Sequence, residues 1–230
     1  MLITIDGPVA TGKSSIAKKL AEELGYIYFD TGAMYRGLTW FVLQKKIDVN
    51  NPIEVADLLD QFVFEIKIKH GDRLYFVNKE NVTDAIRRDQ VTSLVSEVSA
   101  NPVVREKLVK TQREFAVGVN SVFEGRDMGS VVFPDADLKI FLTARIEVRA
   151  KRRYLELKAK FPEESGTLTI EKAIEDINKR DAYDTERVNS PLIQARDAII
   201  VDTSDKTIDE VVFEILELKD QKRFHVKSDK

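Results

Sequence analysis

Residues 7–14 read Gly7-Pro8-Val9-Ala10-Thr11-Gly12-Lys13-Ser14, which fits the pattern G-x-x-x-x-G-K-[ST] at every defined position. Glycines at this spacing let the backbone curl so that successive N–H groups point at a bound anion. The pattern predicts that Lys13 reaches the β- and γ-phosphates of a nucleoside triphosphate and that the Ser14 hydroxyl ligates Mg²⁺. We expect Gly7 to Ser15 to form this nucleotide-binding loop, with Lys13 at an exposed loop-to-helix junction.

The flanking sequence supplies the structural context that this loop requires. Leu2 to Asp6 is a short run with β-branched character and predicts a buried strand. After Ser14, apolar residues recur at spacings of three and four up to Leu24, which predicts one face of an amphipathic helix, and Gly25 stands where a left-handed C-cap belongs. The positive end of this helix would point at the same anion. The sequence therefore predicts binding of a nucleoside triphosphate.

Four later runs resemble the first strand and are separated by helical stretches: Tyr26 to Asp30, Ser121 to Glu124, Leu138 to Thr143 and Ala198 to Asp202. Short buried strands alternating with helices are typical of a parallel sheet covered on both faces. We expect an α/β fold with a five-stranded parallel sheet flanked by helices.

Two stretches interrupt this alternation. Residues 62–69 alternate between apolar and polar after Val63, and Gly71-Asp72 makes a turn into Leu74 to Val77, which predicts an antiparallel hairpin inserted in the core. Residues 145–187 hold 11 basic and 10 acidic residues among 43 and include the loop Phe161 to Gly166. So charged a segment indicates a mobile helical lid, or else a plain solvated helical hairpin.

Composition excludes several classes of protein. The chain has 230 residues, 43% of them hydrophobic, with no cysteine and two histidines, so neither disulfides nor a thiolate zinc site are expected. The chain contains no run of about 18 apolar residues, so no membrane span is predicted. No secretory signal is recognised before the loop, so we expect a cytoplasmic protein. A net charge of −3 argues against a nucleic-acid polymer as partner.

Arginines mark a second anion site. Arg36 follows the second predicted strand, Arg126 follows the third, and Arg180 and Arg187 close the charged segment. Any one of them alone is better explained by a surface salt bridge, but ligands of parallel sheets gather at the carboxyl ends of strands, where these arginines lie. No N-K-x-D motif of a regulatory GTPase is present. A small-molecule kinase with an anionic acceptor fits this arrangement.

These arginines lie in or near four longer motifs: D-T-G-A-M-Y-R at 30–36, E-G-R-D-M-G-S-V-V-F-P-D-A at 124–136, R-D-x-x-D-x-x-R at 180–187 and P-L…A-x-D-A-x-x-x-D at 191–202. From Leu2 to about Val212 the chain resembles the bacterial cytidylate kinases, which belong to the nucleoside monophosphate kinases with a phosphate-binding loop. The resemblance implies a single domain over 1–230. Its core would be 1–36, 90–145 and 188–218, with a nucleoside-monophosphate-binding insertion at about 37–89 and a lid at about 146–187.

The resemblance also implies residue roles. Arg36, Arg126 and Arg187 would hold the acceptor phosphate with Thr31 nearby, Asp184 and Arg180 would contact the ribose, and Ser96, Arg105 and Asp127 would read cytosine. Without it, Ser96 and Arg105 would count as ordinary helix-surface residues. Arg149, Arg152 and Arg153 share one helix face. The resemblance makes Arg152 and Arg153 candidates for contacting the transferring phosphate, with Arg152 as part of the ATP site. The candidate catalytic residues are Lys13, Arg126, Arg153 and Arg187.

The implied reaction moves the γ-phosphate of ATP to CMP, and also to dCMP, in a monomer that uses Mg²⁺. No general base is needed because the acceptor phosphate is already ionised. Two alternatives stay open: a kinase of the same fold acting on UMP, AMP or shikimate, and a regulatory nucleotide-binding module with slow hydrolysis. A second metal-binding carboxylate is not evident, although Asp127 is conceivable. Thr11 stands where a glycine is common, and the loop at 161–167 is longer than usual.

Overall fold

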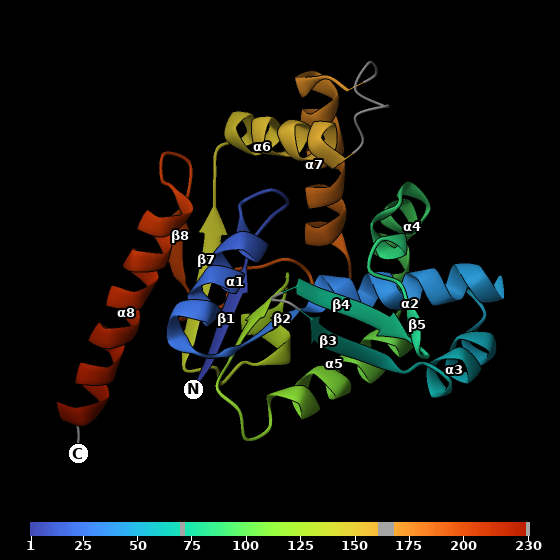
Figure 1. Cartoon of the computed structure of the whole chain (residues 1–230), viewed down its shortest axis with the longest axis horizontal. Helices are drawn as coiled ribbons and strands as arrows, with labels where there is room; N and C mark the ends of the chain where they lie inside the picture. Colours follow the sequence, from blue (N-terminus) through green and yellow to red (C-terminus); the bar gives the residue numbers. More distant parts are fainter. Residues whose placement is uncertain (70–71, 161–167, 229–230) are drawn as a thin grey trace. The chain divides into compact units, whose positions relative to one another are not determined.

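The computed structural model describes residues 1–69, 72–160 and 168–228 (Figure 1). It divides the chain into two compact units, Met1–Phe29 with Gly118–Lys230, and Asp30–Val117. The second unit contains the whole of the predicted insertion at 37–89 and extends beyond it on both sides. Gly71 of the predicted hairpin turn and the loop at 161–167 lie outside the described residues.

The first unit carries the central sheet and the phosphate loop. In chain order its elements are β1 (Leu2–Asp6), α1 (Lys13–Leu24), β2 (Ile27–Asp30, whose last residue begins the second unit), β6 (Ser121–Glu124), η2 (Met128–Val132), β7 (Leu138–Thr143), α6 (Ile146–Lys160), α7 (Ile170–Glu186), β8 (Ile199–Asp202) and α8 (Ile208–Ser228).

The sheet has five strands in the order β2-β6-β1-β7-β8. Strand β1 lies at its centre and pairs in parallel with β6, Ile5 opposite Glu124, and with β7, Ile5 opposite Ile140. The predicted five-stranded parallel sheet is therefore confirmed, with each strand within one residue of its expected start. Because β1 is central, the loop that follows it lies at the carboxyl ends of β6 and β7.

Helices α1 and α8 cover the sheet with one apolar cluster. Ile16 and Leu20 of α1 and Ile215 of α8 are buried against Ile3 and Ile140 of the strands. The expected C-cap is present, because Gly25 has φ 65° and its N–H closes the last turn of α1. Burial of this helix fixes the position of its first residue, Lys13, and so of the loop before it.

Helices α6 and α7 form the described part of the charged segment. They pack against each other, and Ala150, Ala173 and Ile177 make a small apolar cluster against Val9 and Ala10 of the phosphate loop. The described part of the segment is thus mainly helical, as both the lid and the solvated hairpin interpretations require. Its mobility stays a prediction.

The second unit is built from helices and a small antiparallel sheet. Its elements are α2 (Thr31–Lys45), α3 (Pro52–Asp60), β3 (Phe64–Lys69), β4 (Asp72–Val77), β5 (Glu80–Asn81), η1 (Ala85–Arg87), α4 (Asp89–Ala100) and α5 (Pro102–Ala116). The sheet order is β3-β4-β5, which confirms the predicted hairpin and adds a short third strand.

This second sheet packs closely on α2. A Cβ atom at Gly37 would lie 3.0 Å from the ring of Phe64, so the helix approaches the hairpin where a side chain is missing. Phe64 stacks in turn on Tyr75, with ring centroids 6.0 Å apart. The unit therefore has an apolar core of its own, built from α2 to α5 and the hairpin.

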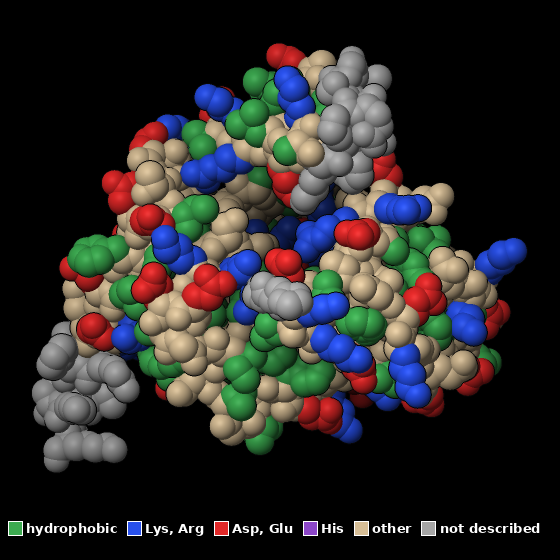
Figure 2. Space-filling model, in the orientation of Figure 1, with side chains coloured by type: hydrophobic (Ala, Val, Ile, Leu, Met, Phe, Trp, Pro, Cys, Tyr) green, Lys and Arg blue, Asp and Glu red, His purple; other side chains and the backbone are tan. Residues whose placement is uncertain are grey.

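The surface carries no large region of one charge on the face shown in Figure 2, where basic and acidic side chains are interspersed. This agrees with the net charge of −3. Among the residues described, no helix has the length and apolarity needed to cross a membrane.

Candidate active site

The phosphate loop depends on two glycines with positive φ. Gly7 has φ 146°, and a Cβ there would lie 2.3 Å from the carbonyl oxygen of Leu142, which no side chain can accommodate. Gly12 has φ 92° and precedes the first residue of α1. Ala10, at φ 60°, adds a third left-handed residue. The loop therefore curls directly into a helix N-terminus, as an anion-binding loop requires.

Lys13 is buried, with 5% of its surface exposed, so the expectation of an exposed junction is wrong. Its ammonium group donates to the carbonyl oxygen of Pro8 at 2.5 Å and lies 3.4 Å from Thr11 Oγ1. Burial, and then the nearby Arg126 guanidinium, lower the pKa of Lys13 well below its usual value. A phosphate anion arriving in the loop would favour the charged form, because it would supply the compensating charge.

Thr11 strengthens the loop from within. Its hydroxyl donates to Pro8 O at 3.1 Å, and its own carbonyl accepts from Thr203 Oγ1 at 3.0 Å. A glycine at position 11 could make only the second of these bonds. The departure from the common pattern at this position therefore has a structural counterpart in the loop.

Ser14 lies beside a carboxylate that the sequence did not identify as a partner. Its hydroxyl donates to Glu124 Oε1 at 2.5 Å, across 110 residues of chain. Glu124 ends β6 and is 4% exposed. A hydroxyl and a carboxylate suit Mg²⁺, which prefers oxygen ligands and keeps several waters. No group of three or more His, Cys, Asp or Glu side chains that could hold a metal ion occurs in the described part of the chain.

The arginines of the first unit form a compact ion-pair cluster. Arg126 Nε donates to Asp184 Oδ2 at 2.8 Å, and Arg187 lies 3.8 Å from Asp127 and 3.9 Å from Asp184. Burial opposes the charge of Arg126, but the attraction of Asp184 prevails and raises the pKa of Arg126. Four predicted acceptor-site residues are thus brought together, from the loop after β6 and from the end of α7. Arg180 is half-buried on the same helix.

Asp6, the last residue of β1, anchors the segment that carries Arg126 and Asp127. Its carboxylate accepts from the backbone N–H of Met128 at 2.8 Å and of Gly129 at 2.7 Å. Burial raises the pKa of Asp6 to about 7, although these two hydrogen bonds counteract the shift. No role for Asp6 beyond ending a strand was predicted from the sequence.

Hydrogen bonds join α6 and α7 to the phosphate loop. Asp181 Oδ1 accepts from the N–H of Val9 at 3.0 Å, and Arg149 donates both to the carbonyl of Val9 and to Asp181. Asp181 was part of a recognised motif without an assigned role. Its place in the motif, next to Arg180, was the available signal.

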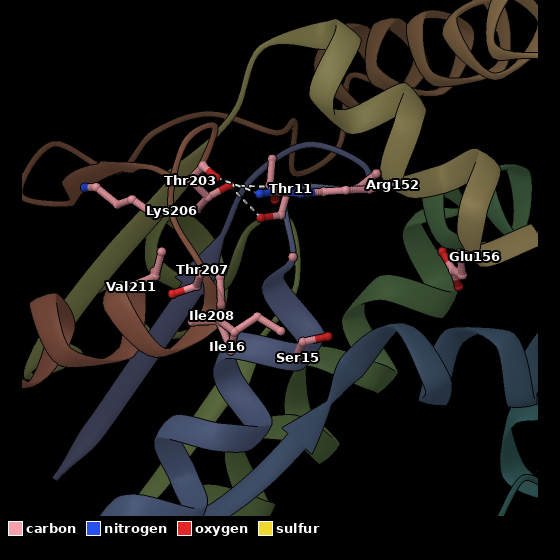
Figure 3. A pocket seen from close by; sticks show the side chains of 12 residues that line it. Thr11, Ser15, Ile16, Arg152, Glu156, Thr203, Lys206, Thr207, Ile208 and Val211 are labelled. Atoms are coloured by element: carbon pink, nitrogen blue, oxygen red, sulfur yellow. Dashed lines mark hydrogen bonds between the residues drawn. The ribbon is translucent and has the colours of Figure 1, made fainter.

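Arg152 and Arg153, predicted to act together, have different partners. Arg152 donates to the side chain and carbonyl of Thr203 at 2.9 and 2.6 Å, whereas Arg153 pairs with Glu156 at 3.1 Å. Arg152 lines a pocket of about 330 Å³ beside the phosphate loop. Figure 3 shows Thr11, Thr203 and Arg152 along one side of this pocket, and Ile16 and Ile208 along another. A flat ring could pack between such walls.

In the second unit, Arg36 is held by its own helix. Asp30 caps α2 by accepting from Ala33 N at 2.8 Å, and its other carboxylate oxygen lies 3.2 Å from Arg36 Nη2. Thr31 is buried in the first turn of the same helix. The D-T-G-A-M-Y-R motif therefore folds into a capped helix start with its arginine against the cap.

Arg105 is 5% exposed, so it is not the ordinary helix-surface residue that it would count as without the resemblance. Arg105 lies in the first turn of α5, where Asn101 caps the helix by accepting from Val103 N and Val104 N. The guanidinium of Arg105 donates to Ser99 O at 3.1 Å and lies 5.5 Å from the ring centre of Tyr35. Ser96 is half-buried on α4.

Comparison with known proteins gives one consistent result. The family model described as cytidylate kinase matches residues 3–221. The cytidylate kinase of Protochlamydia amoebophila is 63% identical over 220 residues, covering 96% of each chain. That of Anoxybacillus flavithermus is 47% identical over 215 residues, covering 93% of each. A solved structure from Eubacterium ventriosum has TM-score 0.53 at 16% identity, covering 96% and 98% of the two chains, and shares the fold alone.

Proposed function

This chain belongs to the cytidylate kinase family, and on that premise we propose how its own residues phosphorylate CMP with ATP. The observation that carries the proposal is the buried Lys13 inside a complete phosphate loop, beside a cluster of arginines. The second candidate, a regulatory module with slow hydrolysis, has no observation in its favour. A kinase for shikimate is also disfavoured, because shikimate has no phosphate for the arginine cluster.

ATP would bind along α1 and α6. The backbone of residues 7–15 and Lys13 would hold its phosphates, and the pocket beside Arg152 would take its base. Burial lowers the pKa of both Lys13 and Arg152, so both cations gain from an anionic ligand.

Mg²⁺ would be held by Ser14, with Glu124 beside it as the second oxygen donor. When bound, the ion would neutralise part of the negative charge of the phosphates at this place. Asp127, considered earlier as a metal carboxylate, pairs with Arg187 instead. The two oxygen groups at Ser14 and Glu124 therefore fit the ion better.

CMP would be bound by the residues that the motifs of the family indicate. Arg36, Arg126 and Arg187 would hold its phosphate, with Thr31 nearby. Asp184 and Arg180 would contact the ribose, and Ser96, Arg105 and Asp127 would read the cytosine edge. Since Asp184 already pairs with Arg126, ribose binding would also set the orientation of the arginine.

Catalysis would be positioning and charge neutralisation, without a general base. Lys13, Arg126, Arg153 and Arg187 would surround the transferring phosphate, which carries its charge on oxygens that hydrogen-bond donors can reach. Helices α6 and α7, within the predicted lid at about 146–187, would exclude water and so limit ATP hydrolysis. We propose a cytoplasmic, monomeric enzyme that also accepts dCMP.

A coupled assay of ADP release tests the proposal against its alternatives. With ATP and Mg²⁺ fixed, CMP, dCMP, UMP, AMP and shikimate are each offered as acceptor. We expect fast release with CMP and dCMP and slow release with the others. Release that does not depend on any acceptor would indicate the regulatory module, and a preference for another acceptor would reassign the binding site.

A further inference from the structure

Tyr28 makes a contact that no part of the proposed mechanism uses. It lies on β2 and is 6% exposed, and its hydroxyl donates to Glu124 Oε1 at 3.0 Å. The same oxygen accepts the hydroxyl of Ser14 at 2.5 Å. Two hydroxyl groups from different elements thus converge on one carboxylate oxygen, at the place proposed for the metal.

The topology of the sheet brings this contact about. Strand β2 is the neighbour of β6 in the sheet, and Glu124 is the last residue of β6. Successive side chains of a strand point to opposite faces. Phe29 stacks on Phe123 with ring centroids 4.5 Å apart, while Tyr28 and Glu124 meet each other. The pairing of Tyr28 with Glu124 is therefore built into the position of the two strands.

The hydrogen bond to Tyr28 restricts the carboxylate. A glutamate side chain has several rotamers, and fixing one costs entropy that must be compensated by contacts. The Ser14 bond is in the short range of a charge-assisted O–H···O⁻ bond, which is sensitive to the direction of the acceptor. With Tyr28 in place, Oε1 stays directed at Ser14 before any metal binds. Without the Tyr28 hydroxyl, one of these two contacts to Oε1 is lost and the contact from Ser14 is kept.

We propose that Tyr28 is a positioning residue that holds Glu124 toward Ser14 and so sets the affinity of the ATP complex for a divalent cation. The inference rests on the proposed metal site. Partners that orient metal-binding side chains typically contribute 10- to 100-fold in metal affinity, and we expect about tenfold here because Ser14 also holds Glu124.

A simpler interpretation is that a buried phenol only needs some acceptor, and Glu124 is the nearest. Tyr28→Phe separates the two, because it keeps the ring in the apolar core and removes only the hydroxyl. Tyr26→Phe is the matched control. Tyr26 lies two residues earlier, and its hydroxyl contacts the sulfur of Met1 at 3.6 Å, away from the metal site.

The measurement is the dissociation constant of ATP by calorimetry, once with excess Mg²⁺ and once with excess EDTA, in the absence of any acceptor. The ratio of the dissociation constant in EDTA to the dissociation constant in Mg²⁺ reports how much more tightly the metal is held on protein-bound ATP than on free ATP. We expect the ratio of Tyr28→Phe to fall about tenfold and that of Tyr26→Phe to stay within about twofold of wild type. In the background of Glu124→Gln, Tyr28→Phe should change the ratio no further.

Three results would contradict the proposal. These are an unchanged ratio in Tyr28→Phe, an equal fall in Tyr26→Phe, and a full tenfold fall in the Glu124→Gln background. Ser14→Ala and Glu124→Gln distinguish a failure of the proposed metal site from a failure of the role proposed for Tyr28. If neither alters the ratio, the metal site itself is wrong. If both do and Tyr28→Phe does not, only the role of Tyr28 is overturned.

Discussion

The candidate residues of the two units differ in what holds them in place. In the first unit they are tied to one another across the chain: Arg126 to Asp184, Arg187 to Asp127, and Ser14 to Glu124. In the second unit the hydrogen bonds of Arg36 and Arg105 described above are local. Arg36 pairs with the cap of its own helix, six residues away, and Arg105 donates to a carbonyl six residues before it.

This difference indicates how far the effect of a substitution should extend from the substituted residue. A change within the ion-pair cluster of the first unit removes one partner of a second buried charge, so its effect should spread to the neighbouring residue. A change at Arg36 or its cap should stay within one helix. Four predictions follow this contrast, in order of decreasing effect.

Lys13→Ala should lower kcat about 10²- to 10³-fold, as expected for removal of one donor to a transferring group. The protein should stay folded, because the substitution also removes a buried charge whose pKa burial already lowers. Steady-state kinetics and circular dichroism measure the two. Lys19→Ala, which removes a cation of α1 paired at the surface with Asp209, is the control and should leave kcat unchanged. Turnover of Lys13→Ala within about tenfold of wild type would exclude its catalytic role.

Arg126→Ala should raise KM for CMP about 10- to 100-fold and leave KM for ATP nearly unchanged, since a hydrogen bond to a charged group contributes about 1.5–3 kcal/mol. It should also expose the linkage of the cluster. Adding Asp184→Asn should cost less than the sum of the single changes, because the buried carboxylate that has lost Arg126 as a partner is then gone.

The control for Arg126 is Arg145→Ala. Arg145 makes a two-pronged pair with Asp205, but both side chains are exposed, so we expect no change in either KM. Equal effects of Arg126→Ala on both substrates would remove Arg126 from the acceptor site. Additive effects of Arg126→Ala and Asp184→Asn would contradict the contrast between the units.

Asp127→Asn should reduce the preference for CMP over UMP, which we expect to be at least about tenfold in wild type. A carboxylate accepts from the cytosine amine but opposes the uracil carbonyl, whereas an amide can donate to that carbonyl. Asp127 also neighbours Arg187, so activity on both bases should fall together. Only the ratio of kcat/KM for the two bases reports base reading. Asp135→Asn, exposed in the same motif, is the control. An unchanged ratio in Asp127→Asn would leave Asp127 a purely structural partner of Arg187.

The fold could be predicted from the sequence because its signals are local. The glycine spacing at 7–12, the buried run before it and the apolar periodicity after it each determine a few residues, and the five strands follow the same short pattern. The alternation at 62–69 likewise predicted the hairpin. None of these inferences needed to know which segments meet.

The contacts of the site could not be predicted, because they join distant segments. Ser14 meets Glu124 across 110 residues and Val9 meets Asp181 across 172. Glu124 ends a strand next to the central one, so the rule for parallel sheets could have suggested it. The burial of Lys13 and Arg105 had no comparable signal, since such side chains are rarely buried, and only packing from other elements covers them.

Asp30→Ala should give the smallest effect, and one confined to stability. Asp30 caps α2 through Ala33 N, and loss of an N-cap costs about 1 kcal/mol. Asp30→Asn is the matched variant, because asparagine caps as well as aspartate but removes the charge beside Arg36. Urea unfolding should therefore show a lower free energy for alanine and a smaller loss for asparagine. Equal losses would assign the stability to the ion pair instead of the cap.

Because Arg36 has its cap as partner within one helix, KM for CMP should rise far less in either variant than in Arg126→Ala. If Asp30→Asn raised KM as much as Arg126→Ala does, Arg36 would depend on its partner as strongly as the cluster of the first unit, and the contrast between the two units would not hold.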